Sequence, residues 1–278
     1  MCRWILFLTI LTVFGLMPVL AQVDIRKVDF ANFTYPAFCA SEESENITVK
    51  NREYSFERQE DGYVDRMYMR VYEPVFGDLT GDGRDEAAIV SICNTGGTGQ
   101  FSEGYVFGMS GAKPKLLTRF EGGDRAYGGI REVRIAKGLL SVDRNDPGEI
   151  GANCCAELIV TTTYRLAGDK LEAVGKPVTR PIYPVERVSF AKGANSKTIV
   201  VTIPMDEGRR YVLRAGADQK INVTVDSQDV GIRLFEEADY DYVDGNIVGT
   251  LPKSGDYTVE VRNNSEGPLK VTLTIKIQ

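Results

Sequence analysis

Short stretches of alternating apolar and polar residues, separated by glycine and Asx turns, are the feature that most constrains the fold of this chain of 278 residues. An apolar residue at every second position is the period of a strand with one buried face, whereas helical periodicity is hard to find. The stretches include ITVKNREYSFER, RMYMRVYEPVF, EAAIVSIC, EGYVFGM, IREVRIAKGLLSVDR and ELIVTTTYRLAGDKLEAVG. The pattern predicts an all-β protein, with hairpin turns at AKG and AGD.

A proline-rich stretch, KPVTRPIYPVERV, divides these segments into two groups. It contains Pro177, Pro181 and Pro184, and proline is excluded from central strands, so a stiff linker is expected here. About eight further short segments follow it, which is typical of a sandwich. We therefore expect an antiparallel β domain at 23–180, a linker at 181–185 and a small, jelly-roll-like β-sandwich at 186–278.

The N-terminal segment predicts export. Arg3 precedes an uncharged run from Trp4 to Leu20, and Ala21 is a small residue at the expected cleavage point. These are the parts of a secretory signal peptide, here 1–21. A retained membrane anchor is the alternative, although the run is short for a membrane span. We expect a secreted or periplasmic protein.

Four cysteines remain after the predicted cleavage: Cys39, Cys93, Cys154 and Cys155. An even number in an oxidising compartment predicts two structural disulfides that staple the first domain. Neighbouring cysteines rarely bridge each other, because the geometry is strained. We therefore expect Cys154 and Cys155 each to reach back, one to Cys39 and the other to Cys93. The C-x-x-C spacing of a cysteine metal site is absent.

The chain contains no histidine. This excludes Ser-His-Asp and Cys-His catalysis and histidine-ligated zinc or copper sites. The formal net charge of −6 argues against nucleic acid and is compatible with a cationic protein partner or divalent cations. We expect a protein that is not an enzyme. A glycosidase or lyase that uses a pair of carboxylates is the enzyme class left open.

The stretch FGDLTGDGRDEAAIV, residues 76–90, has the spacing of a calcium loop, with oxygen ligands on alternate residues around glycine. It resembles the calcium loops of FG-GAP repeats, which implies a structural calcium ion. It departs from them at its third position, where an acid or asparagine is usual. The alternative is a tight turn that favours Asp and Gly without a metal. The candidate ligands are Asp78, Thr80, Asp82, the backbone carbonyl of Arg84, and Glu86.

A second acidic segment, EEADYDYVDGN at 236–246, contains Asp239, Asp241 and Asp244 around two tyrosines. Its spacing fits no standard calcium loop. Tyrosine is enriched at protein contacts, so the segment is a candidate acidic surface for a partner. A second cation site and a solvated loop tip are the alternatives.

The second domain contains YVLRAG at 211–216, an alternating strand up to Val225, LPKSGDY at 251–257 and a closing VTLTIKI. With these pieces it resembles the bacterial pre-peptidase C-terminal β-sandwich, and it is similar to the inhibitors of g-type lysozyme, which share that architecture. The resemblance implies a bacterial protein that inhibits a lysozyme by inserting loop residues into its acidic active-site cleft. The positions here that match this role are Ser254, Gly255, Tyr257 and Arg262.

These residues also have a structural explanation, in which Ser254 and Gly255 form a hairpin turn and Tyr257 is a core aromatic. The short turn NNSEG at 263–267 departs from the longer basic segment of the inhibitors, so contacts made by that segment would be missing. The alternative function is an accessory module that binds cell-wall or other glycan. The single tryptophan is Trp4, so a sugar platform would use Tyr or Phe.

Overall fold

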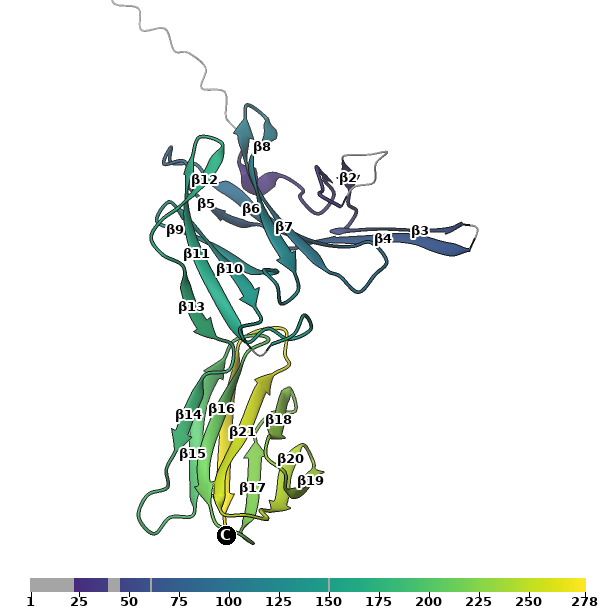
Figure 1. The fold of residues 1–278 in the computed structure, drawn as a ribbon. Coiled ribbons are helices and arrows are strands. Elements are labelled where there is room, and N and C mark those ends of the chain that lie inside the picture. The colour runs from purple at the N-terminus through teal and green to yellow at the C-terminus, as the bar shows by residue number, and fades with distance from the viewer. Residues whose placement is uncertain (1–22, 40–45, 61, 150) are drawn as a thin grey trace, which may run out of the picture.

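The computed structural model describes residues 23–39, 46–60, 62–149 and 151–278, and the predicted signal peptide lies outside them (Figure 1). Apart from one 3₁₀ turn, η1 (Ile25–Lys27), the elements of this part of the chain are strands, which confirms the all-β prediction. No helix among these residues is long and apolar enough to cross a bilayer. Figure 1 shows two bodies of strands joined end to end.

The first domain contains two antiparallel sheets and a short ladder of β1 with β2. One sheet has the order β3-β4-β6-β7-β8, with β5 beside β6, and the other has the order β12-β11-β10-β9, with β13 beside β11. The strands are β1 (Thr34–Tyr35), β2 (Ile47–Thr48), β3 (Glu53–Glu60), β4 (Tyr63–Val71), β5 (Val75–Gly77), β6 (Glu86–Asn94), β7 (Phe101–Ser110), β8 (Lys113–Asp124), β9 (Ile130–Ala136), β10 (Leu139–Asp146), β11 (Leu158–Ala167), β12 (Lys170–Ala173) and β13 (Val178–Pro181).

Strand β6 is buried on both of its faces, which explains its nearly continuous apolar sequence. Ala87 and Ile89 point to one side, where they pack with residues of the N-terminal segment such as Tyr35. Ala88 and Val90 point to the other side and pack against the second sheet. Because successive side chains alternate between faces, one strand serves two cores.

The second domain is a β-sandwich of two sheets, with orders β14-β16-β21-β18 and β15-β22-β17-β20-β19. All pairs are antiparallel except β14 with β16. Buried Leu213 and Val259 of one sheet share a core with Leu273 and Val223 of the other. The strands are β14 (Val185–Val188), β15 (Ser196–Ile203), β16 (Gly208–Ala215), β17 (Lys220–Val225), β18 (Val230–Leu234), β19 (Asp239–Val243), β20 (Asn246–Thr250), β21 (Gly255–Asn263) and β22 (Leu269–Ile277).

The predicted hairpin turns are present. Lys137 and Gly138 have φ of 53° and 73° and join β9 to β10. Gly168, with φ of 65°, lies between β11 and β12. A two-residue turn with positive φ at both positions matches the twist of the flanking strands, so AKG forms a tight hairpin.

The proline-rich linker is hydrogen-bonded to both domains. Strand β13 pairs with β11 of the first domain, and β14 pairs with β16 of the second. Between them Ile182 is 3 % exposed. Its N–H donates to the Glu157 carbonyl at 2.9 Å, and its own carbonyl accepts from the N–H of Gly208 at 3.2 Å. The linker therefore holds the two domains against each other.

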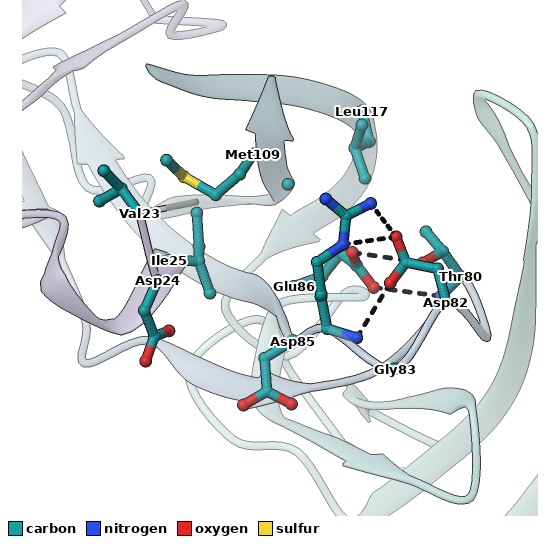
Figure 2. A pocket seen from close by; sticks show the side chains of 12 residues that line it. Val23, Asp24, Ile25, Thr80, Asp82, Gly83, Asp85, Glu86, Met109 and Leu117 are labelled. Atoms are coloured by element: carbon teal, nitrogen blue, oxygen red, sulfur yellow. Dashed lines mark hydrogen bonds and ion pairs between the residues drawn. The ribbon is translucent and has the colours of Figure 1, made fainter. Parts of the chain in front are cut away.

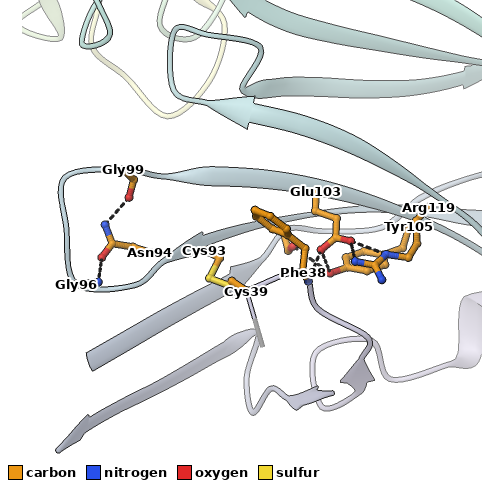
Figure 3. The surroundings of a disulfide bond; sticks show 10 residues. Phe38, Cys39, Cys93, Asn94, Gly96, Gly99, Glu103, Tyr105 and Arg119 are labelled. Atoms are coloured by element: carbon orange, nitrogen blue, oxygen red, sulfur yellow. Dashed lines mark hydrogen bonds and ion pairs between the residues drawn. A yellow bond between two sulfur atoms is a disulfide. The ribbon is translucent and has the colours of Figure 1, made fainter. Parts of the chain in front are cut away.

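The predicted disulfide pairing is wrong, although all four cysteines are bonded. Cys39 bridges Cys93, with 6.3 Å between the Cα atoms, and Cys154 bridges its neighbour Cys155. Figure 3 shows the first bridge at the end of β6. The reason is tertiary: the side of β6 on which Cys93 lies faces the N-terminal segment that carries Cys39. Cys154 and Cys155 lie in the connection between β10 and β11, at the domain junction.

The Cys39–Cys93 bridge lies beside a buried acidic group, Glu103 (Figure 3). The Glu103 carboxylate accepts hydrogen bonds from the N–H of Phe38 at 2.9 Å, the hydroxyl of Tyr105 at 2.8 Å and Nε of Arg119 at 2.6 Å. A buried carboxylate needs such partners to offset its lost hydration. The bridge and this cluster together attach the N-terminal segment to the large sheet.

Candidate functional site

The aspartate loop joins β5 to β6 and is closed by its own carboxylates. The two oxygens of Asp78 accept the N–H groups of Gly81 at 2.7 Å and Gly83 at 2.9 Å. Both glycines have positive φ, 77° and 81°, which a residue with a Cβ adopts only with strain. Asp82 binds the N–H of Arg84 at 2.9 Å and its guanidinium at Nε and Nη2 (Figure 2). These contacts hold the pKa of Asp82 below its usual range.

Glu86 is the buried acid of this loop, with 4 % of the residue exposed. Its Oε2 accepts the N–H groups of Leu79 at 2.8 Å and Thr80 at 3.1 Å. Burial raises the pKa of the Glu86 carboxyl above its usual value, and the two backbone hydrogen bonds counteract part of that effect. Glu86 therefore works as the internal cap of the loop.

The tight-turn alternative fully accounts for the geometry of the loop, because each of the three acids has hydrogen-bond partners inside it. Among the described residues, no three acidic, cysteine or histidine side chains converge on one point. Calcium would have to exchange some of these hydrogen bonds for metal ligation by Asp78, Thr80, Asp82, the carbonyl of Arg84 and Glu86. Calcium binding stays a prediction.

A cavity of about 510 Å³ lies between this loop and the N-terminal segment (Figure 2). Val23, Asp24 and Ile25 line one side of it, and Met109 and Leu117 contribute from the large sheet. Arg26 of the segment forms an ion pair with Asp85 of the loop, with 2.6 Å between Nη2 and Oδ2. The N-terminal segment therefore lies against the aspartate loop and is bound to it by this ion pair.

The acidic segment forms the β19–β20 hairpin. Asp239 and Asp241 are exposed on β19, the edge strand of its sheet. Asp244 occupies the turn before Gly245, with φ of 52° and 78° for the two residues. The side chain of Tyr242 donates to the carbonyl of Ile232 at 3.2 Å. Charges on an edge strand discourage pairing with other strands, so these acids have a structural use as well as the predicted contact role.

Ser254, Gly255 and Tyr257 lie at the end of the second domain that is far from the first domain. The Tyr257 side chain is buried, and its hydroxyl donates to the carbonyl of Lys253 at 2.7 Å and accepts from the N–H of Lys253 at 3.2 Å. Ser254 Oγ accepts the N–H of Ala217 at 2.9 Å. We call residues 251–256, together with the adjoining turn 216–219, the tip loops. Tyr257 therefore supports the tip loops. This agrees with the alternative explanation of Tyr257 as a core aromatic.

Arg262 does not belong to the same surface as Ser254. Strand β21 separates the two residues, and eight residues of strand span about 26 Å. Arg262 instead faces the first domain, where it lines a cleft with Tyr183 and lies 3.8 Å from the carboxylate of Asp206. The structure thus divides the predicted contact residues between two opposite ends of the sandwich.

The polar groups at the domain junction are candidate functional residues that the sequence does not indicate. Arg180 of β13 binds the Glu207 carboxylate through two hydrogen bonds of 2.7 Å. Arg210 of β16 reaches Glu157 of the first domain at 3.2 Å. These partners lie 27 and 53 residues apart in the chain, so no local pattern marks them.

Comparisons with known proteins give partial matches. No family model matches the sequence, and no relative is found among the curated proteins. Among solved structures, the chain is similar to PliG of Aeromonas hydrophila, a periplasmic lysozyme inhibitor of g-type lysozyme, at 25 % identity and a TM-score of 0.31, over 34 % of this chain and 97 % of that one. PliG of Salmonella Typhimurium matches at 24 % identity and a TM-score of 0.30, over 34 % and 98 %. A mutant of the Escherichia coli protein matches at 20 % identity and 0.29, over the same shares.

Proposed function

We propose that this chain is an exported, non-enzymatic binding protein of a bacterium, located in the periplasm or outside the cell, which inhibits a lysozyme by covering its active-site cleft. The contact is made by the tip loops of the second domain. The observation that carries the proposal is the double hydrogen bond between the Tyr257 hydroxyl and the backbone of Lys253. It holds the SGDY turn, which belongs to one of the pieces that carry the resemblance to g-type lysozyme inhibitors, against the preceding residue.

Rigidity and exposure favour the tip loops as a contact surface. Lys253, Ser254 and Asp256 are exposed, while Leu251 and Tyr257 on either side are buried. The Leu251 N–H donates to the carbonyl of Gln219, and its carbonyl accepts from the N–H of Asp218, each at 2.8 Å. A loop ordered before binding loses little conformational entropy when it enters a cleft, so more of the contact energy appears as affinity.

The charges of this end also suit a lysozyme. Lys253 is exposed at the tip, where it can enter an acidic cleft. Asp239 lies opposite Thr250 in the β19–β20 ladder, and Thr250 directly precedes the tip loops. Asp239 can therefore face the basic surface around such a cleft. Complementary charge chiefly speeds association and selects the partner.

The test is a cell-wall clearing assay with the chain from residue 22 to 278 against goose-type, chicken-type and invertebrate-type lysozymes. The exported chain is expected to inhibit one type selectively. Lys253→Glu keeps the backbone contacts with Tyr257 and reverses the tip charge, so inhibition should fall about tenfold or more. Lys270→Glu makes the same charge change at an exposed position at the other end of the sandwich and should inhibit like the parent.

Absence of inhibition of every lysozyme type by the parent chain would refute the function. A different result would refute the tip loops as the contact surface. This is the case if Arg262→Gln no longer inhibits while Lys253→Glu inhibits normally. In that case the end of the sandwich that faces the first domain would carry the activity.

One observation favours glycan binding as a second candidate function. Phe38 and Phe101 are 60 % and 38 % exposed, and their ring centres lie 6.0 Å apart. They stand beside a cavity lined by Phe38, Glu103 and Arg119. Exposed aromatic faces beside polar side chains can stack on sugar rings. Retention of the chain on purified cell-wall sacculi, lost in Phe38→Ala and kept in Lys253→Glu, would support this function.

A further inference from the structure

A cleft of about 480 Å³ lies at the junction of the two domains, and both domains line it. The first domain contributes Arg131 at the start of β9 and the Cys154–Cys155 pair of the β10–β11 connection. The second domain contributes arginines from three of its strands: Arg210 of β16, Arg233 of β18 and Arg262 of β21. Neither domain alone contains this group.

Aromatic rings hold two of these guanidinium groups in place. The Arg210 guanidinium carbon lies 4.8 Å from the ring centre of Tyr183 and 5.0 Å from that of Phe235. The Arg233 guanidinium lies 4.7 Å from the ring centre of Phe235. Stacking covers ring surface that a sugar would need and leaves the N–H edge of the Arg233 guanidinium for a ligand, whereas Arg210 donates to Glu260 and Glu157. The cleft is therefore built for an anion and not for a sugar ring.

The carboxylates of the cleft neutralise only part of its positive charge. Arg210 is held by Glu260 at 2.9 Å and by Glu157 at 3.2 Å. Within the described residues, neither Arg131 nor Arg233 forms an ion pair with a carboxylate within 4.0 Å. Among the residues that the structure describes, the Arg131 side chain donates one hydrogen bond, to the carbonyl of Met205 at 2.7 Å.

The remaining arginine is also incompletely paired. Arg262 is 3.8 Å from Asp206, which is outside hydrogen-bond distance, and its side chain is 51 % exposed. Counting all the charged side chains that line the cleft, four arginines face three carboxylates. The cleft is thus locally cationic in a chain whose net charge is −6.

We propose that the domain-junction cleft is a binding site for a small ligand that carries a carboxylate or phosphate group. Arg131, Arg233 and Arg262 bind the anion. Arg210, which lies against Tyr183 and Phe235, is the positioning residue, because it packs on the same Phe235 ring as Arg233. Guanidinium groups pair with either kind of oxyanion through two parallel N–H···O bonds, so both sources share one recognition chemistry. The site needs both domains, because Arg131 comes from the first and the other arginines come from the second.

The test is titration calorimetry of the exported chain at physiological salt, with citrate as the carboxylate probe and inorganic phosphate as the other. Saturable binding of one probe is expected and identifies the source. Arg233→Gln and Arg131→Gln should each weaken it about tenfold or more, the loss expected for one charge-assisted contact. Arg165→Gln is the matched control, because it removes an exposed arginine of the β11–β12 hairpin that pairs with Glu172 outside the cleft.

Two results would overturn the proposal. One is the absence of saturable binding of both probes, and the other is binding that Arg165→Gln weakens as much as Arg233→Gln does. Thermal unfolding of each variant shows whether it is folded. Arg233 is exposed at the surface, so its glutamine variant is expected to fold like the parent and keeps the test decisive.

Discussion

Arg180 and Glu207 join the two domains through a pair of parallel hydrogen bonds, each 2.7 Å long. The Glu207 side chain is 5 % exposed and that of Arg180 is 42 % exposed. The backbone carbonyl of Glu207 also accepts the N–H of Asn263 at 2.9 Å. One buried carboxylate thus connects the last strand of the first domain to the connection between β15 and β16 in the second.

Replacing Glu207 with glutamine should loosen this junction. The change removes the charge that pairs with Arg180 inside a desolvated contact, so we expect a loss of about 1–3 kcal/mol in the free energy of unfolding. Urea denaturation measures it. Arg165→Gln breaks an exposed pair and should cost less than about 0.5 kcal/mol. Equal losses in both variants would contradict a structural role for the junction pair.

The two disulfides should contribute very different amounts to stability. Cys39 and Cys93 are 54 residues apart. Closing a loop of that length lowers the entropy of the unfolded chain, which raises the free energy of unfolding by about 4 kcal/mol. Cys154 and Cys155 are neighbours, so their bridge restricts the unfolded chain very little. Paired Cys→Ser variants of each bridge, compared by urea denaturation, test this. A larger loss for the Cys154–Cys155 variant would contradict it.

Asp143 should make the stability depend on pH in the acidic range. Burial alone would raise the pKa of its carboxyl, but hydrogen bonds from Arg134 and Thr161 outweigh burial and hold the pKa below its usual value. A carboxyl whose pKa is lowered by folding stabilises the protein above its unfolded pKa of about 3.9, and this stability is lost as the pH falls through the folded value.

The comparison that isolates this effect is the parent against Asp143→Asn. The difference in unfolding free energy should be largest near neutral pH and shrink as the pH falls below about 4. Asp169→Asn, in an exposed turn, should differ from the parent by a small and constant amount. A difference for Asp143→Asn that does not change between neutral and acidic pH would refute the assignment.

Calcium should stabilise the chain modestly if the aspartate loop binds it. With a dissociation constant of about 10⁻⁴–10⁻³ M, about 1 mM calcium adds about 0.4–1.4 kcal/mol to the free energy of unfolding. Asp82→Asn should remove this increment, because it withdraws one of the predicted ligands. Magnesium is the ionic control. Identical unfolding with calcium, magnesium and a chelator would leave the loop as a turn closed by its own hydrogen bonds.

Tyr257→Phe should weaken lysozyme inhibition more than it weakens the fold. The change removes one hydroxyl with two contacts to Lys253, which costs about 0.5–1.5 kcal/mol of stability and frees the tip loop. Tyr242→Phe also removes a hydroxyl contact, to the carbonyl of Ile232, but leaves the tip loops intact. Clearing assays below the unfolding temperature of both variants compare them. Equal inhibition would show that loop order does not matter for binding.

Several local features could be predicted from the sequence. Alternation along β16 and β21 indicated a half-buried sheet, and the structure places Tyr257, Val259 and Val261 on the core side, as that period requires. The turn at Lys137 and Gly138 followed from its glycine, which accepts positive φ without strain. The tight-turn alternative for the aspartate loop likewise accounts for the capping by Asp78.

The sequence by itself thus determined the fold class and the local turns, because both depend on residues a few positions apart. Only the tertiary structure decided which cysteines meet, that Arg262 faces the first domain, and how Arg131 joins Arg233 in one cleft. These outcomes depend on sheet order and on the contact between domains. Such contacts bring together residues far apart in the chain, and the period of an individual strand carries no information about its distant partners.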